Sequence, residues 1–337
     1  MNTFSVAEIE DQAGVMTFLD PGQWLSVGII VFIVVVAFYL WMHNVPTYIG
    51  TTDLSGKTVI ITGSNAGIGY TTALDLARRN ARVIMACRNL SKSEGARNEI
   101  VRLTGNENVV VRELDLARLK SVREFAERVN KEEARLDILI NNAGVTGLPN
   151  KMSEDGLEVN FATNHFGPFL LTNLLLDLLK KSAPSRIVNV SSTVQRFGKI
   201  DFDNLRAEKS FSPHRIYFNS KLANVLFARE LARRLADTGV TACSLHPGSV
   251  RTNLLDNMPF YVRFPMALFR VFLRSPEEGA QTTLYCALAD EVSDLSGKYF
   301  AECELAETQV NALANDEAVC RKLWEISCRY TGLEDKL

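Results

Sequence analysis

The stretch KTVIITGSNAGIG, residues 57–69, decides the fold that this chain is expected to adopt. Its first part, Lys57–Thr62, is short and rich in β-branched residues, which is typical of a buried parallel strand. A glycine-rich turn follows directly, and we expect a helix from about Gly67 to Asn80. Glycines let the backbone approach a pyrophosphate, and the N-terminus of a helix favours its negative charge. The segment therefore predicts a dinucleotide-binding turn.

The glycines of this turn are spaced G-x3-G-x-G, whereas the commoner dinucleotide pattern is G-x-G-x-x-G. A glycine cluster alone is weak evidence, so the prediction depends on the strand before the turn and the helix after it. The cofactor contacts expected from the turn are Gly63, Ser64, Asn65, Gly67, Ile68 and Gly69.

Beyond Thr52 the expected strands and helices alternate along the chain. Such alternation implies a parallel sheet with helices on both faces. Residues 53–337 are therefore predicted to form one doubly wound α/β domain of the Rossmann type. The further strands are Arg82–Ala86, Val109–Arg112, Asp137–Ile140, Arg186–Val190 and Val240–Leu245, and the helical stretches include Leu157–Lys180 and Tyr217–Ala236.

The end of the second strand bears on the choice of cofactor. NAD sites usually place an acidic residue there, which bonds the ribose 2′-hydroxyl. Here the sequence from Met85 to Asn89 is MACRN, with no acid and with Arg88. A guanidinium pairs with a 2′-phosphate, which a carboxylate would repel, so NADP(H) is favoured over NAD. The alternative is that Arg88 is a solvated arginine at the end of a strand.

The composition is that of a folded protein that does not bind nucleic acid. Of its 337 residues, 47% are hydrophobic and 23% are charged, which excludes disorder over most of the length. The 37 basic and 39 acidic residues leave a net charge of −2, whereas a polyanion-binding protein carries a basic excess.

The apolar residues are concentrated near the N-terminus, in Trp24–Met42. As a helix this segment would rise about 28 Å, close to the hydrocarbon thickness of a bilayer. Aromatic residues lie at both of its ends, where interfacial aromatics belong. We expect a tail over residues 1–22 and a transmembrane anchor over residues 23–43. The alternatives are a buried core helix or a cleaved signal peptide, but no basic residue precedes Lys57, as a signal peptide would require.

Lysines and arginines lie only on the C-terminal side of the apolar segment, so the positive-inside rule places the main domain in the cytosol. The six cysteines form neither a CxxC pair nor a dense framework, and they are expected to be reduced thiols, as in the cytosol.

Tyr217 and Lys221 are four residues apart, a spacing that places both side chains on one face of a helix. A neighbouring ammonium stabilises a phenolate, so it is expected to lower the pKa of the tyrosine towards the working pH. Such a tyrosine can protonate a carbonyl oxygen or deprotonate an alcohol. The alternative is a surface pair that arises by chance.

Five motifs follow one another in an order that resembles the short-chain dehydrogenase/reductase family, over roughly residues 55–300. They are Thr62–Gly69, Asn141–Gly144, Asn189–Ser192, Tyr217-x3-Lys221 and Pro247-Gly248.

The resemblance implies a catalytic set in which Tyr217 is the acid/base and Lys221 its activator. In the family a serine after the fifth strand also polarises the substrate oxygen; Ser191 and Ser192 are both available, and the motif alignment favours Ser192. The interval to Tyr217 is longer than usual, and Arg196–His214 resembles an insertion of the retinol dehydrogenase branch. Asn164 matches an asparagine that holds a water between the lysine and solvent.

The resemblance also implies further cofactor contacts, and Tyr217 and Lys221 are themselves among them. Asp115 and Leu116 lie near the adenine, and the segment Asn142, Ala143 and Gly144 lines the adenosine side. Pro247, Gly248, Val250 and Thr252 resemble the segment that closes over the nicotinamide. The same comparison implies a possible homodimer through the helices that carry Asn164 and Tyr217.

Several details resemble the membrane-bound retinol dehydrogenase group in particular. They are the phosphate turn, Ala86-Cys87-Arg88, Asn164–Gly167 and the sequence from Tyr217 to Phe227, together with the apolar N-terminal segment. This group mostly uses NADP(H) and interconverts retinal and retinol or reduces lipid-derived aldehydes. We therefore expect a single-pass protein of the endoplasmic reticulum membrane that reduces retinal, with its catalytic domain facing the cytosol.

Two rival functions stay open from the sequence: a reductase of steroids or other lipid carbonyls, and a non-catalytic NADP-binding membrane scaffold. The four histidines lack a zinc-binding motif, so no metal is expected. Phe260–Arg274 interleaves aromatics with arginines and is expected to form a substrate lid, with membrane contact or ordinary helix packing as alternatives.

Overall fold

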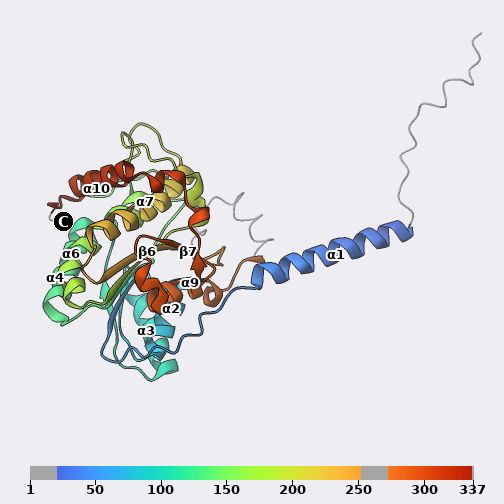
Figure 1. Ribbon diagram of the computed structural model, residues 1–337, viewed down its shortest axis with the longest axis horizontal. Coiled ribbons are helices and arrows are strands. Elements are labelled where there is room, and N and C mark those ends of the chain that lie inside the picture. The colour runs from blue at the N-terminus through green and yellow to red at the C-terminus, as the bar shows by residue number, and fades with distance from the viewer. Residues whose placement is uncertain (1–20, 252–271, 336–337) are drawn as a thin grey trace, which may run out of the picture. The chain divides into compact units, whose positions relative to one another are not determined.

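The computed structural model describes residues 21–251 and 272–335, and the chain divides into two units after Asn44. The first unit contains the helix α1, Pro21–His43. The second unit, Val45–Leu337, contains a single eight-stranded sheet with helices packed on both faces (Figure 1). The expected lid segment Phe260–Arg274 and Thr252 lie wholly or mainly outside the described residues.

The sheet has the strand order β3-β2-β1-β4-β5-β6-β7-β8. All neighbouring strands from β3 to β7 are parallel, and β8 runs antiparallel to β7. This confirms the doubly wound parallel sheet, apart from its last strand. The strands are β1 Thr58–Thr62, β2 Arg82–Cys87, β3 Val109–Glu113, β4 Ile138–Asn141, β5 Ser185–Val190, β6 Val240–His246, β7 Tyr299–Ala301 and β8 Glu304–Leu305.

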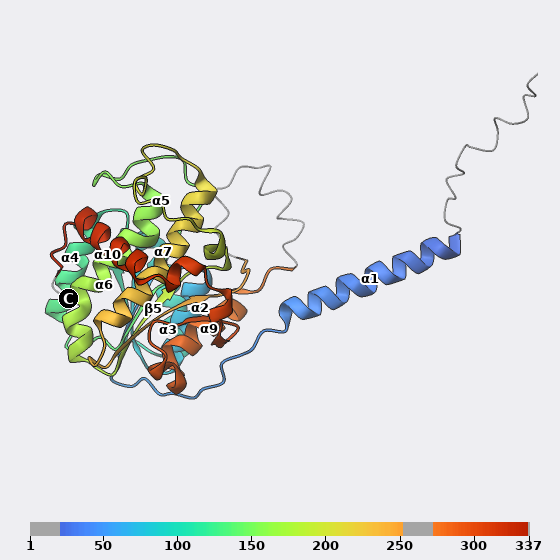
Figure 2. The same ribbon diagram turned by 45° about the horizontal axis from the view of Figure 1, so that its top comes forward.

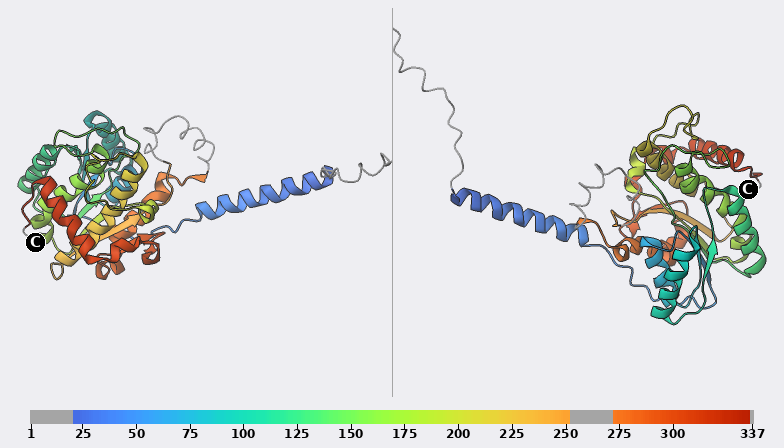
Figure 3. Two further views of the ribbon diagram at one scale, coloured as in Figure 1. Left: turned by 90° about the horizontal axis from the view of Figure 1, so that it is seen from above. Right: turned by 180° about the vertical axis from the view of Figure 1, so that it is seen from behind.

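Two hydrophobic cores lie on the two faces of the sheet. One face packs against α2 Gly67–Arg78, α3 Leu90–Thr104 and α9 Pro276–Leu288 (Figures 1 and 2). The other packs against α4 Leu119–Glu132, α6 Gly167–Lys181 and α7 Pro213–Arg234. The helix α10, Glu317–Thr331, lies along α7 and α6 on that second side (Figure 3). Strands buried on both faces explain the short, continuously apolar runs in the sequence.

The helix expected over Leu157–Lys180 is present without a break from Val159 to Lys181, and it contains one π-helical turn. It consists of a short turn α5, Val159–Phe161, then the π-helical turn η2, Ala162–Phe166, and then α6. Such π-turns inside α-helices occur frequently at functional sites. The helix expected from Tyr217 begins one turn earlier, at Pro213, because proline is favoured in the first turn of a helix.

The apolar side chains of α1 are exposed from Trp24 to Leu40, the part of the helix whose side chains the structure describes. Among the described residues, no helix meets both the length and the apolar character needed to cross a membrane.

The sheet order reverses between β1 and β4, since β1 has β2 on one side and β4 on the other. In doubly wound sheets, ligands bind at the carboxyl ends of the strands beside such a switch point. The phosphate turn follows β1, and Asn142 follows β4, so the fold brings these two predicted motifs to the same place.

Candidate active site

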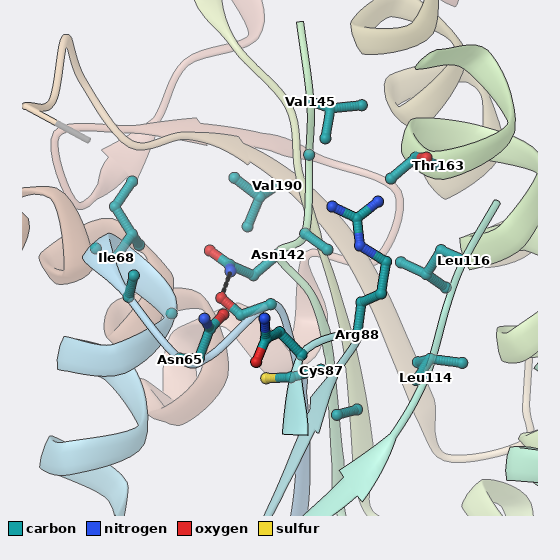
Figure 4. Close-up of a pocket in the computed structure, with 18 of the residues that line it drawn as sticks. Asn65, Ile68, Cys87, Arg88, Leu114, Leu116, Asn142, Val145, Thr163 and Val190 are labelled. Carbon is teal, nitrogen blue, oxygen red and sulfur yellow. Dashed lines mark hydrogen bonds between the residues drawn. The ribbon is translucent and has the colours of Figure 1, made fainter. Parts of the chain in front are cut away.

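A pocket of about 470 Å³ opens at the carboxyl ends of β1, β2, β4 and β5 (Figure 4). It joins the phosphate turn, the end of β2 and the two residues Tyr217 and Lys221 of α7 in one cavity. The expected site residues that line it are Gly63, Asn65, Gly67, Ile68, Gly69, Arg88, Asp115, Leu116, Asn142, Ala143, Gly144, Tyr217, Lys221 and Pro247.

The glycines of the turn adopt a backbone that other residues disfavour. Gly63 has φ +66° and Gly67 has φ +56°, both in the left-handed region. The Asn142 side chain holds the turn, donating to the main-chain oxygens of Thr62 at 2.9 Å and of Gly63 at 3.3 Å (Figure 4). The Thr62 hydroxyl oxygen in turn accepts from the main-chain N–H groups of Asn142 and Ala143, each at 3.0 Å.

The N-terminus of α2 fits an anionic ligand. Its N-cap, Ala66, has an extended backbone and provides no side-chain acceptor for the first N–H groups of the helix. These unsatisfied donors and the helix dipole favour a phosphate group beside the turn. The turn therefore fits the pyrophosphate of a dinucleotide.

Gly69 has no room for a side chain. A Cβ atom there would lie 2.5 Å from both the Asn142 side-chain nitrogen and the Gly63 carbonyl oxygen. We expect Gly69→Ala to displace the turn and to weaken binding of a reduced nicotinamide dinucleotide, measured by fluorescence titration, by at least about tenfold. Gly95→Ala in α3 is the matched control, because no atom lies within 4 Å of the added Cβ; it should bind the dinucleotide normally and raise stability by about 0.5–1 kcal/mol. Equal binding by the two variants would contradict this account of the turn.

Three other expected cofactor contacts, Ser64, Gly248 and Val250, do not line the pocket and instead make contacts within the protein. The Ser64 hydroxyl is buried and donates to the Ile61 carbonyl oxygen at 3.0 Å. Gly248, with φ +89°, packs against the Arg274 side chain, where a Cβ would lie 2.5 Å from the guanidinium. Val250 pairs with Arg274 in an isolated bridge.

Two cations lie where β2 leads into α3. Arg88 lines the pocket, and Figure 4 shows its extended side chain beside Leu116. Lys92 also lines it and was missed by the sequence analysis. It lies in the first turn of α3, whose N-cap, Asn89, accepts from the Lys92 N–H at 2.9 Å. The signal was present in the sequence as a second basic residue four positions after Arg88, at the predicted start of a helix.

Ser192, Tyr217 and Lys221 come together where β5 ends beside α7. The Lys221 ammonium donates to the Val190 carbonyl oxygen at 3.0 Å and lies 5.8 Å from the centre of the Tyr217 ring. The Ser192 side chain lies near enough to the Tyr217 phenol to lower its pKa.

The structure separates the two candidate serines. The Ser191 hydroxyl is buried and donates to the main-chain oxygen of Lys221 at 2.6 Å, so it fixes the helix. Ser191 is also the one of the two that lines the pocket, whereas Ser192 lies outside the lining and interacts with Tyr217 through its side chain. The choice of Ser192 as the catalytic serine stays a prediction.

The expected lowering of the tyrosine pKa is wrong for this structure. Burial raises the pKa of Tyr217 to about 12, and the hydrogen bond from Ser192 opposes this only in part. Burial also lowers the pKa of Lys221 to about 8. The cause is desolvation, which penalises the charged form of each group and outweighs the stabilisation that the ammonium would give to a phenolate. Tyr217 is therefore a protonated phenol at neutral pH.

Asn164 lies in the π-turn η2, and its side chain is fully engaged with the protein. The amide oxygen accepts from the Val145 N–H at 2.8 Å, and the amide nitrogen donates to the Val145 carbonyl at 2.9 Å and to the Ser220 hydroxyl at 3.0 Å. Gly144 lies next to both Lys221 and Asn164: a Cβ atom at Gly144 would be 3.2 Å from the Lys221 nitrogen and 3.6 Å from the Asn164 amide oxygen. Asn164 thus lies close behind the lysine, outside the lining of the pocket.

Of two histidines near the site, His165 is buried and His246, at the end of β6, is only partly buried. His165 is buried among aromatic rings, its Nε2 lies 2.9 Å from the Ser327 hydroxyl, and burial lowers its pKa to about 3. Burial, with the nearby Arg274 charge, lowers the pKa of His246 to about 4. Over the part of the chain that the structure describes, no group of three or more His, Cys, Asp or Glu side chains is arranged to hold a metal ion.

Comparisons with known proteins agree with this geometry. Residues 57–259 match the family described as short chain dehydrogenase. Retinol dehydrogenase 11 of Homo sapiens is 49% identical over 283 residues, which cover 84% of this chain and 88% of that protein. Retinol dehydrogenase 12 of Bos taurus is 50% identical over 281 residues, covering 83% of this chain and 88% of that protein.

The fold has the same support from solved structures. The crystal structure of an uncharacterized protein from Mycobacterium paratuberculosis is 35% identical in sequence, with a TM-score of 0.68. The likeness covers 87% of this chain and 98% of that one. The chain therefore belongs to the short chain dehydrogenase family, in its retinol dehydrogenase group, and is an oxidoreductase that acts on CH–OH and C=O groups with a nicotinamide cofactor.

Proposed function

We propose that this protein is an NADP(H)-dependent enzyme that interconverts retinal and retinol and works mainly as a retinal reductase. The observation that carries the proposal is that Tyr217 and Lys221 line the same pocket as the phosphate turn and the cations Arg88 and Lys92. One cavity thus contains an acid for a carbonyl oxygen and donors for a phosphorylated dinucleotide.

The proposed roles of the residues are those that the resemblance to the family implies, and their positions around the pocket support them. When bound, the nicotinamide supplies or accepts the hydride. Tyr217 donates its phenolic proton to the carbonyl oxygen, and Ser192 polarises that oxygen through a hydrogen bond. The Lys221 ammonium stabilises the phenolate that remains. The resemblance to the family, rather than a contact of its side chain, assigns Asn164 to the relay that returns a proton from solvent. A pKa of about 12 keeps Tyr217 protonated, which is the form that reduction requires.

The preference for NADP(H) rests on the charges at the end of β2. Arg88 and Lys92 both line the pocket there, and no acidic residue lies between Met85 and Asn89. A guanidinium and an ammonium pair with a 2′-phosphate, and neither gains from a bare 2′-hydroxyl.

The variants Arg88→Ala and Lys92→Ala test this preference. Each is expected to raise the KM for NADPH by about tenfold or more, because a hydrogen bond to a charged group contributes about 1.5–3 kcal/mol. The KM for NADH should stay nearly the same, so the cofactor preference narrows. Steady-state kinetics with both cofactors measures this, and an equal loss with NADH would contradict a 2′-phosphate contact.

The substrate class is supported by the relatives, which are named retinol dehydrogenases. The full chain, purified in detergent, would be offered retinal, a ketosteroid and a medium-chain aldehyde with NADPH or NADH. Retinal with NADPH should give the highest kcat/KM. Turnover of the steroid alone would favour the rival lipid-carbonyl reductase. NADPH binding without turnover of any of them would favour the non-catalytic scaffold.

The same proposal includes membrane attachment through α1. Its support is the exposure of apolar side chains from Trp24 to Leu40 and the absence of basic residues before Lys57. The site would then face the cytosol at the endoplasmic reticulum, where a membrane-dissolved aldehyde can reach it. Alkaline extraction of microsomes and protease protection test attachment and orientation; release into the supernatant would oppose an anchor.

A homodimer through α6 and α7 stays a prediction. Any such contact has to accommodate α10, which packs on these helices through Trp324 against Phe169 and Phe227.

A further inference from the structure

The turn that follows Ser192 is a short 3-10 helix, η3 Thr193–Phe197, with Ser192 as its N-cap. The Ser192 carbonyl oxygen accepts from the Gln195 N–H at 3.1 Å, and its hydroxyl oxygen accepts from the Val194 N–H at 3.4 Å. The hydroxyl proton takes no part in that contact, and the side chain also interacts with the Tyr217 phenol. The direction of the Ser192 hydroxyl therefore depends on the conformation of η3.

Asn311 forms hydrogen bonds to this turn although it is far away in the sequence. It lies between η7 Glu307–Gln309 and η8 Ala312–Asn315. Its side-chain nitrogen donates to the carbonyl oxygens of Gln195 at 3.2 Å, Arg196 at 3.0 Å and Gly198 at 3.0 Å. Its side-chain oxygen accepts a hydrogen bond from the Leu313 N–H at 3.0 Å and so caps the N-terminus of η8.

The Gln195 side chain makes the reciprocal contacts. It is fully buried, its nitrogen donates to the Gln309 carbonyl at 2.8 Å, and its oxygen accepts from the Asn311 N–H at 3.0 Å. A buried amide that loses a partner is costly, so the two segments hold each other in one arrangement. The exposed Phe197, 69% accessible, shows that η3 reaches the surface immediately beyond this contact.

We propose that Asn311 and Gln195 are positioning residues for the reaction, holding η3 so that the Ser192 hydroxyl points at the substrate oxygen beside Tyr217. The inference rests on the proposed role of Ser192. A displacement of about 1 Å in a reacting group can lower a rate by as much as 100-fold, so a loosened turn affects turnover without touching substrate.

Asn311→Asp removes the donor to the three carbonyls and keeps an oxygen that can cap η8. Asn311→Ser likewise keeps a good N-cap residue but shortens the side chain and adds no charge. The matched control is Asn315→Asp, an exposed position at the end of η8. Each is made in the full chain, alone and combined with Ser192→Ala. The measurements are kcat for retinal reduction, the Kd for NADPH and the thermal midpoint.

Both Asn311 variants are expected to lower kcat about tenfold in the native background, with NADPH affinity unchanged within about twofold. In the Ser192→Ala background they should have almost no further effect on kcat, because there is no hydroxyl left to position. Asn315→Asp should leave kcat unchanged in both backgrounds.

Two results would overturn the inference in distinguishable ways. If Ser192→Ala lowers kcat but the Asn311 variants lower it by the same factor in both backgrounds, the contact is merely structural and the role of Ser192 survives. If Ser192→Ala leaves kcat unchanged, the proposed role of Ser192 fails and the positioning role fails with it.

Discussion

Replacing Tyr217 with Phe is expected to lower retinal turnover by roughly 10³-fold, within the range that a general acid contributes. In the proposed reaction the phenol gives its proton to the substrate oxygen, and with a pKa of about 12 it is fully protonated at neutral pH. Phenylalanine fills the same space and removes only the hydroxyl. NADPH should therefore bind with nearly unchanged affinity, which fluorescence titration measures alongside steady-state kinetics.

Tyr330→Phe is the matched control for this substitution. Tyr330 lies in α10, where its ring contacts Phe166 and the Arg206 guanidinium, outside the pocket lining. Loss of its hydroxyl should leave turnover within about twofold of the native rate, as expected for a site remote from the chemistry. Full activity of Tyr217→Phe would remove this tyrosine from the proton transfer.

Replacing Lys221 with Met is expected to lower kcat by about 10²-fold and to raise the thermal midpoint at pH 7. Methionine has a similar length without the charge that stabilises the phenolate. Burial lowers the pKa of Lys221 from 10.5 to about 8, so the folded protein binds this proton more weakly than the unfolded chain. The charged lysine thus opposes folding at neutral pH, and its removal stabilises the fold.

The sign of the pH dependence follows from the same shift. In the native protein, reduction should be constant below about pH 8 and fall above it, as Lys221 loses its proton. The stability gained by Lys221→Met should shrink between pH 8 and the ordinary pKa of lysine. In this range the unfolded chain keeps the lysine proton while the folded protein has lost it, so the native protein becomes more stable as the pH rises. Melting curves and pH–rate profiles of both proteins check this. A variant that loses activity and also melts earlier would point to structural damage.

The fold could be predicted because its signals are local. The run of β-branched residues before Gly63 is buried in the middle of the sheet, and the Tyr217–Lys221 spacing holds because both lie on one continuous helix. The last two strands, β7 and β8, were missed because they have three and two residues, too few to show any periodicity.

The less local features could not be predicted. Burial decides the pKa of Tyr217, and the sequence does not show how much water reaches a side chain. The contact between Gln195 and Asn311 joins residues 116 positions apart, with no spacing rule to connect them. The π-turn at Asn164 departs from an otherwise helical pattern by a single turn, which hydrophobic periodicity does not detect.

We propose above all that a hydride passes from NADPH to the aldehyde carbon of retinal while Tyr217 donates a proton to the oxygen. The most direct measurement incubates the purified full chain with retinal and NADPH deuterated at both C4 positions of the nicotinamide, and analyses the product by mass spectrometry. We predict retinol with one deuterium on the former aldehyde carbon, and almost none with Tyr217→Phe. No retinol from the native protein, or retinol without deuterium, would contradict the account.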